Sequence, residues 1–312
     1  MIVTVTLNPA IDKTVEIDEL LPGGLNRIQK VEYDAGGKGI NVSKTIQQLG
    51  GTSIAAGFLG GNAGKIIETV LNDSGIQNDF IWVDGETRTN TKVYEKNGEV
   101  TELNEPGPEI APEHLEQLIK KLEGYADENT LFVLAGSIPN GVDQTVYATI
   151  TERVHRRGAK VLLDADGELF RSGLEAGPDM IKPNRVELEE YAGFDYRASI
   201  EELLQTAKGL QSKGIQTVAV SMGRGGAMFV REGYEVRCPA LTVKAHSTVG
   251  AGDAMVAALS YAWSQNLDNE QTVQLCMAAS AGAVTTIGTK PPTRELVDEL
   301  MKQVVIEQLS TS

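Results

Sequence analysis

The sequence is poor in the residues from which disulfide frameworks, metal centres and hydrolytic triads are built. Its 312 residues include two cysteines, Cys238 and Cys276, which lie far apart and without metal-ligand spacing. The three histidines, His114, His155 and His246, are scattered along the chain. The sparse cysteines favour a reducing compartment, the cytoplasm, and the lack of a paired Ser/His/Asp or Cys/His set argues against hydrolysis by an activated nucleophile.

Positive charge is also scarce. Lysine and arginine together number 28 against 43 for aspartate and glutamate, which gives a net charge of −15. This excess of negative charge argues against nucleic acid and anionic membranes as partners. No apolar run approaches membrane-spanning length, and residues 1–7 lack the basic leader of a signal peptide.

Segments typical of strands and of helices alternate along most of the chain. Strands are expected at 2–7, 53–58, 131–134, 160–163, 180–181 and 217–221, and helices at 39–49, 64–71, 113–122, 144–156, 186–191 and 200–210. We expect the last third to be helical, over 254–263, 272–285 and 294–309. The alternation predicts an α/β fold, with a mostly parallel central sheet covered by helices on both faces and ligands bound at the carboxyl ends of its strands.

Two interruptions break this alternation. Residues 14–17 and 28–33 are short strand-like segments without a helix between them, and 88–95 and 99–104 form a hairpin at the favoured turn Asn97-Gly98. Neither pair forms a crossover unit. The sequence therefore predicts a single domain, 1–312, with a small β-sheet inserted at about 12–34 and 87–105 that serves as a lid, an interaction edge or both.

A glycine-rich loop, from Ser247 to Ala254, precedes a run of small apolar residues that reads as a buried helix. The amides of Gly250, Ala251 and Gly252 would then lie at a helix N-terminus, which favours anions. A carboxylate at Asp253 would repel such an anion unless it has a chemical role, although it is also a common helix cap. We expect the helix terminus to lower the pKa of Asp253.

A second glycine-rich turn is Gly36-Gly37-Lys38-Gly39, where Lys38 and Asn41 lie one helical turn apart and share a face. Neither a Walker A spacing nor a Gly-x-Gly-x-x-Gly after a strand occurs. The combination is suited to a polyhydroxylated anion, the alternative being an ordinary strand-to-helix turn.

Further polar residues follow the expected strands. Arg88, Asn90 and Lys92 share one strand face, which suits a bound phosphate or is simply a face exposed to solvent. Asp12 could accept hydrogen bonds from sugar hydroxyls, or it could be a turn residue. Asn184 and Glu187 have a spacing suited to water-bridged Mg²⁺ and equally to a capping box. Near the end of strand 217–221, the backbone amides of Ser221, Gly223 and Gly226 would face phosphates. Ser137, after strand 131–134, would place a hydroxyl at the same rim.

The run 36–41, the run Lys182-Pro183-Asn184 with Glu187, and the run 248–253 occur in this order in a chain of this size. Together they resemble the ribokinase/PfkB family of carbohydrate kinases over essentially the whole length. The start, residues 6–12, looks like the phosphosugar branch of that family, the 1-phosphofructokinases and tagatose-6-phosphate kinases, and several stretches look most like the former. The resemblance implies a ribokinase-like three-layer αβα fold.

The resemblance also implies roles for individual residues. Asp253 would be the general base, and the amides of Gly250, Ala251 and Gly252 the anion hole. ATP would lie along Lys182, Asn184, Ser221, Gly223, Gly226 and Thr248, with Mg²⁺ held by Glu187 through water and near Asn184. The sugar would contact Asp12, Gly37 and Asn41, its phosphate would meet Lys38, Arg88 and Arg27, and Asn90 and Ser137 would border this subsite.

The expected activity is transfer of the ATP γ-phosphoryl group to O6 of fructose 1-phosphate. A tagatose-6-phosphate kinase and a non-catalytic phosphosugar sensor are the alternatives, and a monovalent-cation requirement is left open. The projecting strands would match the family's lid, which implies a homodimer formed through that sheet. No nucleic acid or membrane partner is expected, and the small-molecule partners would be the sugar phosphate and ATP.

Overall fold

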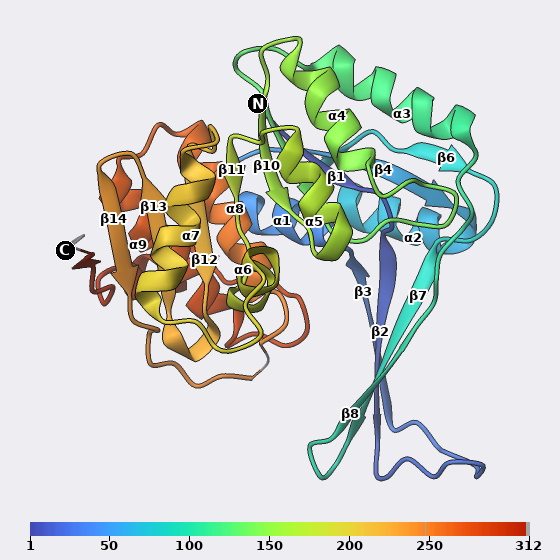
Figure 1. Ribbon diagram of the computed structural model, residues 1–312. Helices are drawn as coiled ribbons and strands as arrows, with labels where there is room; N and C mark the ends of the chain where they lie inside the picture. Colours follow the sequence, from blue (N-terminus) through green and yellow to red (C-terminus); the bar gives the residue numbers. More distant parts are fainter. Residues whose placement is uncertain (247, 310–312) are drawn as a thin grey trace.

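The computed structural model describes residues 1–246 and 248–309, so Ser247, the first residue of the second glycine-rich loop, lies outside it. A large sheet crosses the body of the protein in the order β15-β14-β13-β12-β11-β10-β9-β1-β4-β5, with β6 paired to β4 (Figure 1). The strands β4, β1, β9, β10, β11 and β12 are parallel, and β13, β14 and β15 are antiparallel. The predicted mostly parallel sheet is therefore confirmed.

The strands of this sheet are β1 (Ile2–Thr6), β4 (Ile54–Gly60), β5 (Gln77–Asn78), β6 (Ile81–Val83), β9 (Leu131–Ala135), β10 (Lys160–Asp164), β11 (Met180–Ile181), β12 (Thr217–Ser221), β13 (Ala227–Arg231), β14 (Tyr234–Cys238) and β15 (Glu307–Gln308). The helices are α1 (Lys38–Gln48), α2 (Gly61–Asp73), α3 (Pro112–Tyr125), α4 (Val146–His155), α5 (Gly167–Glu175), α6 (Arg185–Ala192), α7 (Ile200–Gln211), α8 (Ala251–Ser264), α9 (Asn269–Ala283) and α10 (Arg294–Met301). A short 3-10 turn, η1 (Gly223–Gly225), follows β12.

Helices cover both faces of the sheet and make a three-layer structure. One apolar core joins the sheet to the face formed by α3, α4, α5, α6 and α7. The other face is covered by α1, α2, α8, α9 and α10. The central strands are buried on both faces, as continuous apolar strands of a parallel sheet require. This arrangement is the predicted ribokinase-like αβα fold.

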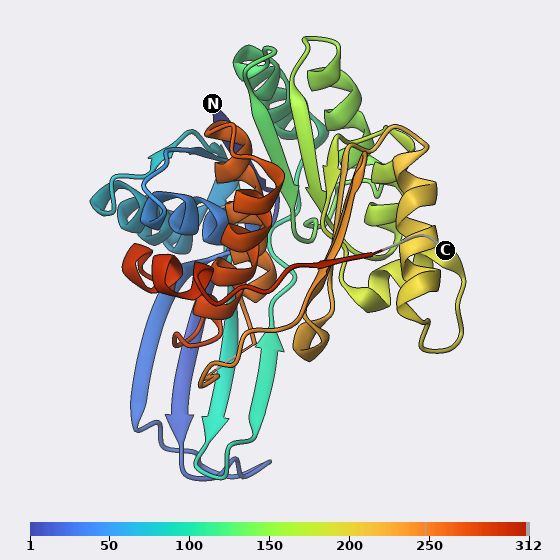
Figure 2. The ribbon, with the colours of Figure 1, turned by 90° about the vertical axis from the view of Figure 1, so that its left-hand side faces the viewer.

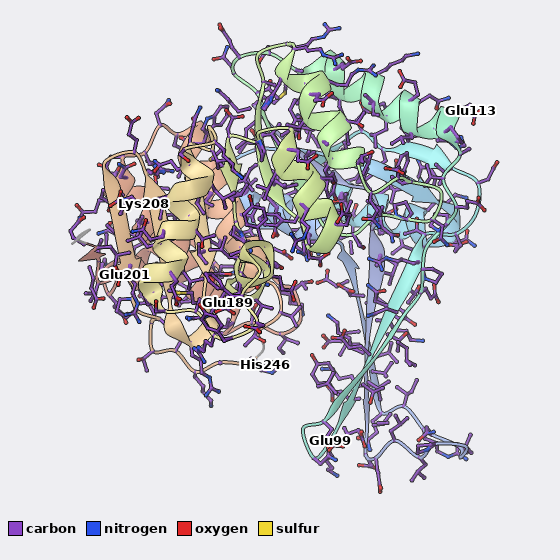
Figure 3. All side chains as sticks on the ribbon, viewed as in Figure 1. Glu99, Glu113, Glu189, Glu201, Lys208 and His246 are labelled. Carbon is purple, nitrogen blue, oxygen red and sulfur yellow. The ribbon has the colours of Figure 1, made fainter. Side chains whose placement is uncertain are left out.

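A four-stranded second sheet projects from the body, and Figure 2 shows its strands side by side below it. The strand order is β3 (Lys30–Gly36), β2 (Ala10–Ile17), β7 (Arg88–Glu95) and β8 (Val100–Asn104). Glu99 lies at the far tip of this small sheet (Figure 3). The small sheet and its hairpin were predicted from the sequence, although β2 starts earlier and β3 ends later than expected.

The helices expected at 254–263 and 272–285 are present as α8 and α9, but the rest of the last third differs from the expectation. The hairpin β13–β14 lies in this region, and α10 ends at Met301 rather than near residue 309. Both faces of β13 are covered by helices, so its residues Met228, Phe229 and Val230 are all buried and show no alternation of polar and apolar side chains. The helix α5 was not anticipated either. No helix in 1–246 or 248–309 is long and apolar enough to cross a membrane.

Candidate active site

A cavity of about 1140 Å³ opens at the carboxyl ends of the parallel strands. Single small-molecule sites rarely exceed about 1000 Å³, so this volume suits two ligands side by side. Every predicted site residue except Arg27 lines it. The lining includes Asp12, Gly37, Lys38, Asn41, Arg88, Asn90, Ser137, Lys182, Asn184, Glu187, Ser221, Gly223, Gly226, Thr248, Gly250, Ala251, Gly252 and Asp253.

Asp253 lies in the first turn of α8 and is only 8% exposed. Gly250 caps this helix with φ of 85°, a left-handed conformation that glycine adopts without strain. Residues 253–260 of this helix are all buried, which anchors its first turns beside the cavity. The carboxylate Oδ2 accepts a hydrogen bond of 2.8 Å from Asn41 Nδ2, so α1 and α8 meet at this atom.

The expectation of a lowered pKa for Asp253 was wrong. Burial raises its pKa to about 6, and the nearby Asp164 carboxylate adds to the increase. The hydrogen bond from Asn41 and the charges of Lys38 and Lys182 offset only part of this effect. Desolvation therefore outweighs the helix terminus, and the carboxylate is a better proton acceptor than the sequence suggested.

Two lysines converge on Asp164, which ends β10 and is 2% exposed. Lys38 Nζ lies 3.6 Å from Asp164 Oδ2, and Lys182 Nζ lies 3.3 Å from Oδ1. Burial would lower the pKa of Lys38, but Asp164 and Asp253 raise it overall, so the ammonium stays charged. Two cations are thus held beside the proposed base, where their charges can act on anionic ligands.

Lys182 also approaches the second glycine-rich loop. A Cβ atom placed on Gly252 would lie 3.4 Å from Lys182 Nζ, so the ammonium packs directly against the backbone of that residue. The helix amides and this lysine therefore present positive charge from two sides of the same point.

The opposite end of the cavity is lined by the small sheet. Burial raises the pKa of Asp12, while Lys92 and a hydrogen bond from Asn90 pull it down. A Cβ on Gly36 would fall 2.3 Å from Asp12 Oδ2, so a larger residue at this position would displace the carboxylate from its place in the cavity. The buried oxygens Thr6 Oγ1, Asn8 Oδ1, Asn41 Oδ1 and Asn90 Oδ1 line the cavity without a hydrogen-bond partner in the protein. Unpaired buried acceptors mark a place where ligand hydroxyls would donate.

Arg88 lies between this end and the loops that follow β8 and β9. Its Nε and Nη2 donate to Asn8 O at 3.2 and 3.0 Å, and Nη2 reaches Ser137 Oγ at 3.5 Å. The guanidinium has no carboxylate in hydrogen-bond contact among these partners, which leaves its charge available to an anion in the cavity. Arg27 differs, because it is exposed on the loop between β2 and β3 and does not line the cavity of its own chain.

Asn184 and Glu187 form the capping box that the sequence allowed. Asn184 Oδ1 accepts from Glu187 N at 2.9 Å, and Glu187 Oε2 accepts from Asn184 N at 2.8 Å. Ser221 pairs with Asn184 through a parallel bridge, which brings the end of β12 beside this helix start. A Cβ on Gly226 would collide with Cys238 O at 1.8 Å, so the turn after η1 requires glycine.

The residues present fit a magnesium ion. Three carboxylates, Glu187, Asp164 and Asp166, line the cavity near the start of α6, and burial raises the pKa of Glu187 with a further contribution from Asp164. No cluster of three or more potential ligands was found in the described part of the chain. Mg²⁺ usually binds through one or two carboxylates, water and substrate phosphates, so the donor set suits it better than a fully protein-coordinated metal.

Sequence reasoning missed Asp164, Asp166, Thr6 and Asn8 as candidate site residues. Asp164 and Asp166 directly follow the expected strand 160–163, and a carboxylate at the carboxyl end of a parallel strand is a signal that could have found them. Thr6 ends β1, but nothing in its sequence context shows that its hydroxyl is buried without a partner.

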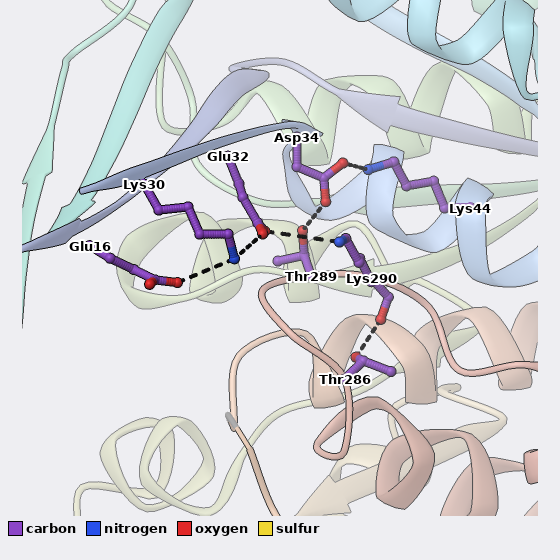
Figure 4. A network of polar contacts seen from close by, with 8 residues as sticks. All are labelled: Glu16, Lys30, Glu32, Asp34, Lys44, Thr286, Thr289 and Lys290. Carbon is purple, nitrogen blue, oxygen red and sulfur yellow. Dashed lines mark hydrogen bonds and ion pairs between the residues drawn. The ribbon is translucent and has the colours of Figure 1, made fainter. Parts of the chain in front are cut away.

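A polar network joins the small sheet to the body beside the cavity (Figure 4). Asp34 of β3 accepts from Lys44 Nζ at 2.7 Å and from Thr289 Oγ1 at 3.4 Å. Lys290 Nζ lies 3.9 Å from Glu32 Oε2. Because Thr289 also packs near Gly250, the network links the small sheet to the loop that begins α8.

Comparison with known proteins agrees with this architecture. Residues 5–296 match the pattern of pfkB family carbohydrate kinases. A 1-phosphofructokinase of Haemophilus influenzae is 34% identical over 309 residues, covering 99% of this chain and 98% of the relative. A crystal structure from Staphylococcus aureus, provisionally described as a phosphofructokinase, has a TM-score of 0.88 at 35% identity and covers all of both chains.

Two further structures support the fold. Phosphofructokinase-2 from Escherichia coli in complex with potassium has a TM-score of 0.92 at 26% identity, covering 97% of this chain and 98% of that one. A ribokinase from Thermotoga maritima, 23% identical, has a TM-score of 0.77 over 96% of this chain and 99% of that one and shares the fold. The chain therefore belongs to the pfkB family of carbohydrate kinases and is an ATP-dependent sugar kinase.

Proposed function

We propose that this kinase transfers the γ-phosphoryl group of ATP to O6 of D-fructose 1-phosphate, giving fructose 1,6-bisphosphate and ADP. The observation that carries the proposal is a single cavity lined by Asp253 and the α8 amides, by the cations Lys38 and Arg88 and, at a glycine-lined end, by Gly223 and Gly226. Arg88 and Lys38 supply the cations at one end, and a sugar that already bears a phosphate would use both. The H. influenzae relative is named a 1-phosphofructokinase, which supports the same substrate for this chain.

The proposed proton acceptor is Asp253. With a pKa of about 6 it is largely ionised at neutral pH and still basic enough to take the proton of the attacking hydroxyl. Asn41 holds one oxygen by a 2.8 Å hydrogen bond, which leaves the other free to face the sugar. The hydroxyl oxygen then bonds to the γ-phosphorus while the bond to the leaving ADP oxygen breaks.

Charge stabilisation comes from groups on opposite sides of the transferring phosphoryl. The amides of Gly250, Ala251 and Gly252 point from the start of α8, and Lys182 packs against Gly252. Asn184, Ser221, Gly223, Gly226 and Thr248 would line the rest of the nucleotide subsite. Mg²⁺, held through water by Glu187 and near Asn184, would neutralise phosphate charge as it does in other kinases. A monovalent-cation requirement stays open.

A tagatose-6-phosphate kinase is the alternative, because the same cations would hold a phosphate at the other end of that ketose. A coupled ADP-release assay with fructose 1-phosphate, tagatose 6-phosphate and fructose 6-phosphate in parallel tests the proposal. We expect kcat/KM to be highest with fructose 1-phosphate. A higher value with either of the others would overturn the substrate assignment, and no turnover with all three would favour a non-catalytic sensor.

The small sheet would act as a lid and as a homodimer interface. Its face toward the cavity is polar, with Asp12, Asn90 and Lys92, whereas Tyr33 and Leu103 lie on the other face and are 64% and 59% exposed. Leu25, Ile28 and Val31 are also exposed on this sheet or its loop. Exposed apolar side chains on a projecting sheet favour association with a second copy. The dimer would act in the cytoplasm, to which the sparse cysteines also point.

Light scattering of the Tyr33→Glu/Leu103→Glu variant tests the dimer. We expect a monomer, while Val305→Glu, which adds charge at a 59% exposed site outside the small sheet, should leave the mass unchanged. An unchanged dimer mass in the double variant would place the interface elsewhere. Because Arg27 lies on the same projecting loop, its role in sugar-phosphate binding would depend on this dimer.

A further inference from the structure

A second cavity, of about 300 Å³, lies at the opposite edge of the large sheet from the candidate active site. Its lining includes Lys160, Met180 and Thr217, the first residues of β10, β11 and β12. The active-site cavity lies where the same strands end. Ala262 and Trp263, near the end of α8, form another part of its wall. No role described above uses this cavity.

Arg231, the last residue of β13, lines this second cavity. Its Nε donates to Thr217 Oγ1 at 3.0 Å, and its Nη1 donates to Asn269 Oδ1 at 2.7 Å. Both partners are neutral. Burial lowers the pKa of Arg231, and no carboxylate of the described chain is among the groups that act on it. A guanidinium has five N–H donors, so three remain beyond these two bonds.

The other charges around the cavity do not compensate Arg231. Asp179 is the carboxylate of the lining, and both of its oxygens are already engaged. It accepts from Lys160 Nζ at 2.9 Å, from Val161 N at 2.9 Å and from Gln216 Nε2 at 3.3 Å, and it contacts His155 Nε2 at 3.0 Å. Lys160 is therefore neutralised by Asp179, and Arg231 is left with an unbalanced positive charge.

We propose that this cavity is a second ligand site, which binds a small oxyanion, a carboxylate or a phosphate, through Arg231 with Lys160 at its rim. A partly desolvated cation without a counter-charge is unfavourable, and an oxyanion in the cavity would supply that charge through charge-assisted hydrogen bonds. A volume of about 300 Å³ is at the lower limit of small-molecule sites, so it suits a small acid and not a nucleotide.

The position of Trp263 in the cavity wall makes the proposal measurable. The chain has two tryptophans, so Trp82→Phe leaves Trp263 as the sole indole emitter. Titration of this variant with inorganic phosphate, and separately with malonate, should give a saturable change in its fluorescence. The change should persist when Lys38→Ala is added, because that substitution weakens anion binding only at the active site.

Matched variants in the Trp82→Phe background decide whether Arg231 is the partner. Arg231→Gln should weaken binding at least about tenfold. Arg237→Gln removes the same charge from the adjacent strand, where Arg237 pairs with Met228 and faces the other side of the sheet, and should bind as before. Ala262→Leu enlarges a residue of the cavity wall and should also abolish binding. Retained kinase activity in Arg231→Gln would show that this variant is folded.

Several outcomes would overturn the proposal. They are the absence of a saturable signal up to about 10 mM of either anion, loss of the signal with Lys38→Ala, and equal affinity in Arg231→Gln. Saturation with malonate but not phosphate, or the reverse, would support the site and identify its oxyanion chemistry.

Discussion

The two edges of the large sheet each hold a buried aspartate, and their surroundings differ sharply. At the amino edge, Asp179 accepts hydrogen bonds from several donors, and despite its burial these contacts, beginning with that of His155, lower its pKa. At the carboxyl edge, Asp253 accepts a hydrogen bond from Asn41 and has a like-charged neighbour in Asp164 and a raised pKa. A fully paired carboxylate stabilises the fold, whereas an underpaired one is held ready to accept a proton.

Replacing the underpaired carboxylate should produce the largest effect on catalysis. We expect Asp253→Asn to bind both substrates with nearly unchanged affinity and to lose about three or more orders of magnitude in kcat, because the hydroxyl proton then has no acceptor. The ADP-release assay and equilibrium binding measure the two quantities. Near-normal turnover would remove Asp253 from the mechanism.

The same substitution should increase stability. Because the folded pKa of Asp253 lies above its ordinary value of 3.8, its ionisation opposes folding. This penalty develops as the pH rises from about 3.8 and is complete above about 6. Asparagine cannot ionise, so Asp253→Asn should raise the free energy of unfolding by about 2 kcal/mol at neutral pH. Urea unfolding at pH 7 and pH 5 measures the gain, which should shrink at the lower pH.

Asp179→Asn should do the opposite. Removing a carboxylate that is paired with Lys160 and His155 should lower the free energy of unfolding by about 3 kcal/mol and leave kcat of the folded enzyme unchanged. The folded pKa of Asp179 is lowered, so its stabilising effect is present above its ordinary value of 3.8 and is lost as the pH falls below it. A large loss of kcat in folded Asp179→Asn would contradict the contrast between the two edges.

Arg88→Ala should mainly affect the acceptor sugar. We expect the KM for the sugar phosphate to rise about 10- to 100-fold with little change in the KM for ATP, because the hydrogen bonds that the guanidinium makes in the protein go to the neutral oxygens of Asn8, Glu105 and Ser137 and its charge is left for the sugar's phosphate. Arg224→Ala, which removes a cation from the turn near the glycine-lined end, is the matched control and should leave the sugar KM unchanged. If Arg88→Ala raised only the KM for ATP, ATP and not the sugar phosphate would lie at Arg88.

The smallest expected effect is a displacement of the pH profile. In the wild type, kcat/KM should fall as the pH drops below about 6, where Asp253 of the free enzyme becomes protonated. Asp164→Asn removes a like charge and should move this limb to lower pH by less than about one unit, provided that Lys38 and Lys182 keep their places. If the acidic side of the kcat/KM profile moved to higher pH instead, the main effect of Asp164 on the pKa of Asp253 would be to hold Lys38 and Lys182 in place.

The sequence predicted those parts of the fold that follow from local patterns. Alternating strands and helices gave the parallel sheet, and the turn Asn97-Gly98 gave the hairpin of the small sheet. It failed where tertiary burial removes the pattern, as in β13, whose two faces are both covered. The capping box of Asn184 and Glu187 could be predicted from the sequence, because its two residues lie three positions apart and form a local motif.

What only the tertiary structure decided is the environment of each charge. The glycine-rich loops, the lysines and Asp253 were recognisable as residues, but 212 positions separate Asn41 from the carboxylate it contacts. Nothing local indicates that Asp164 would lie between two lysines, or that burial would outweigh the helix terminus at Asp253. Sequence specifies which groups are present, and the pKa of each depends on desolvation and on charges brought near by folding.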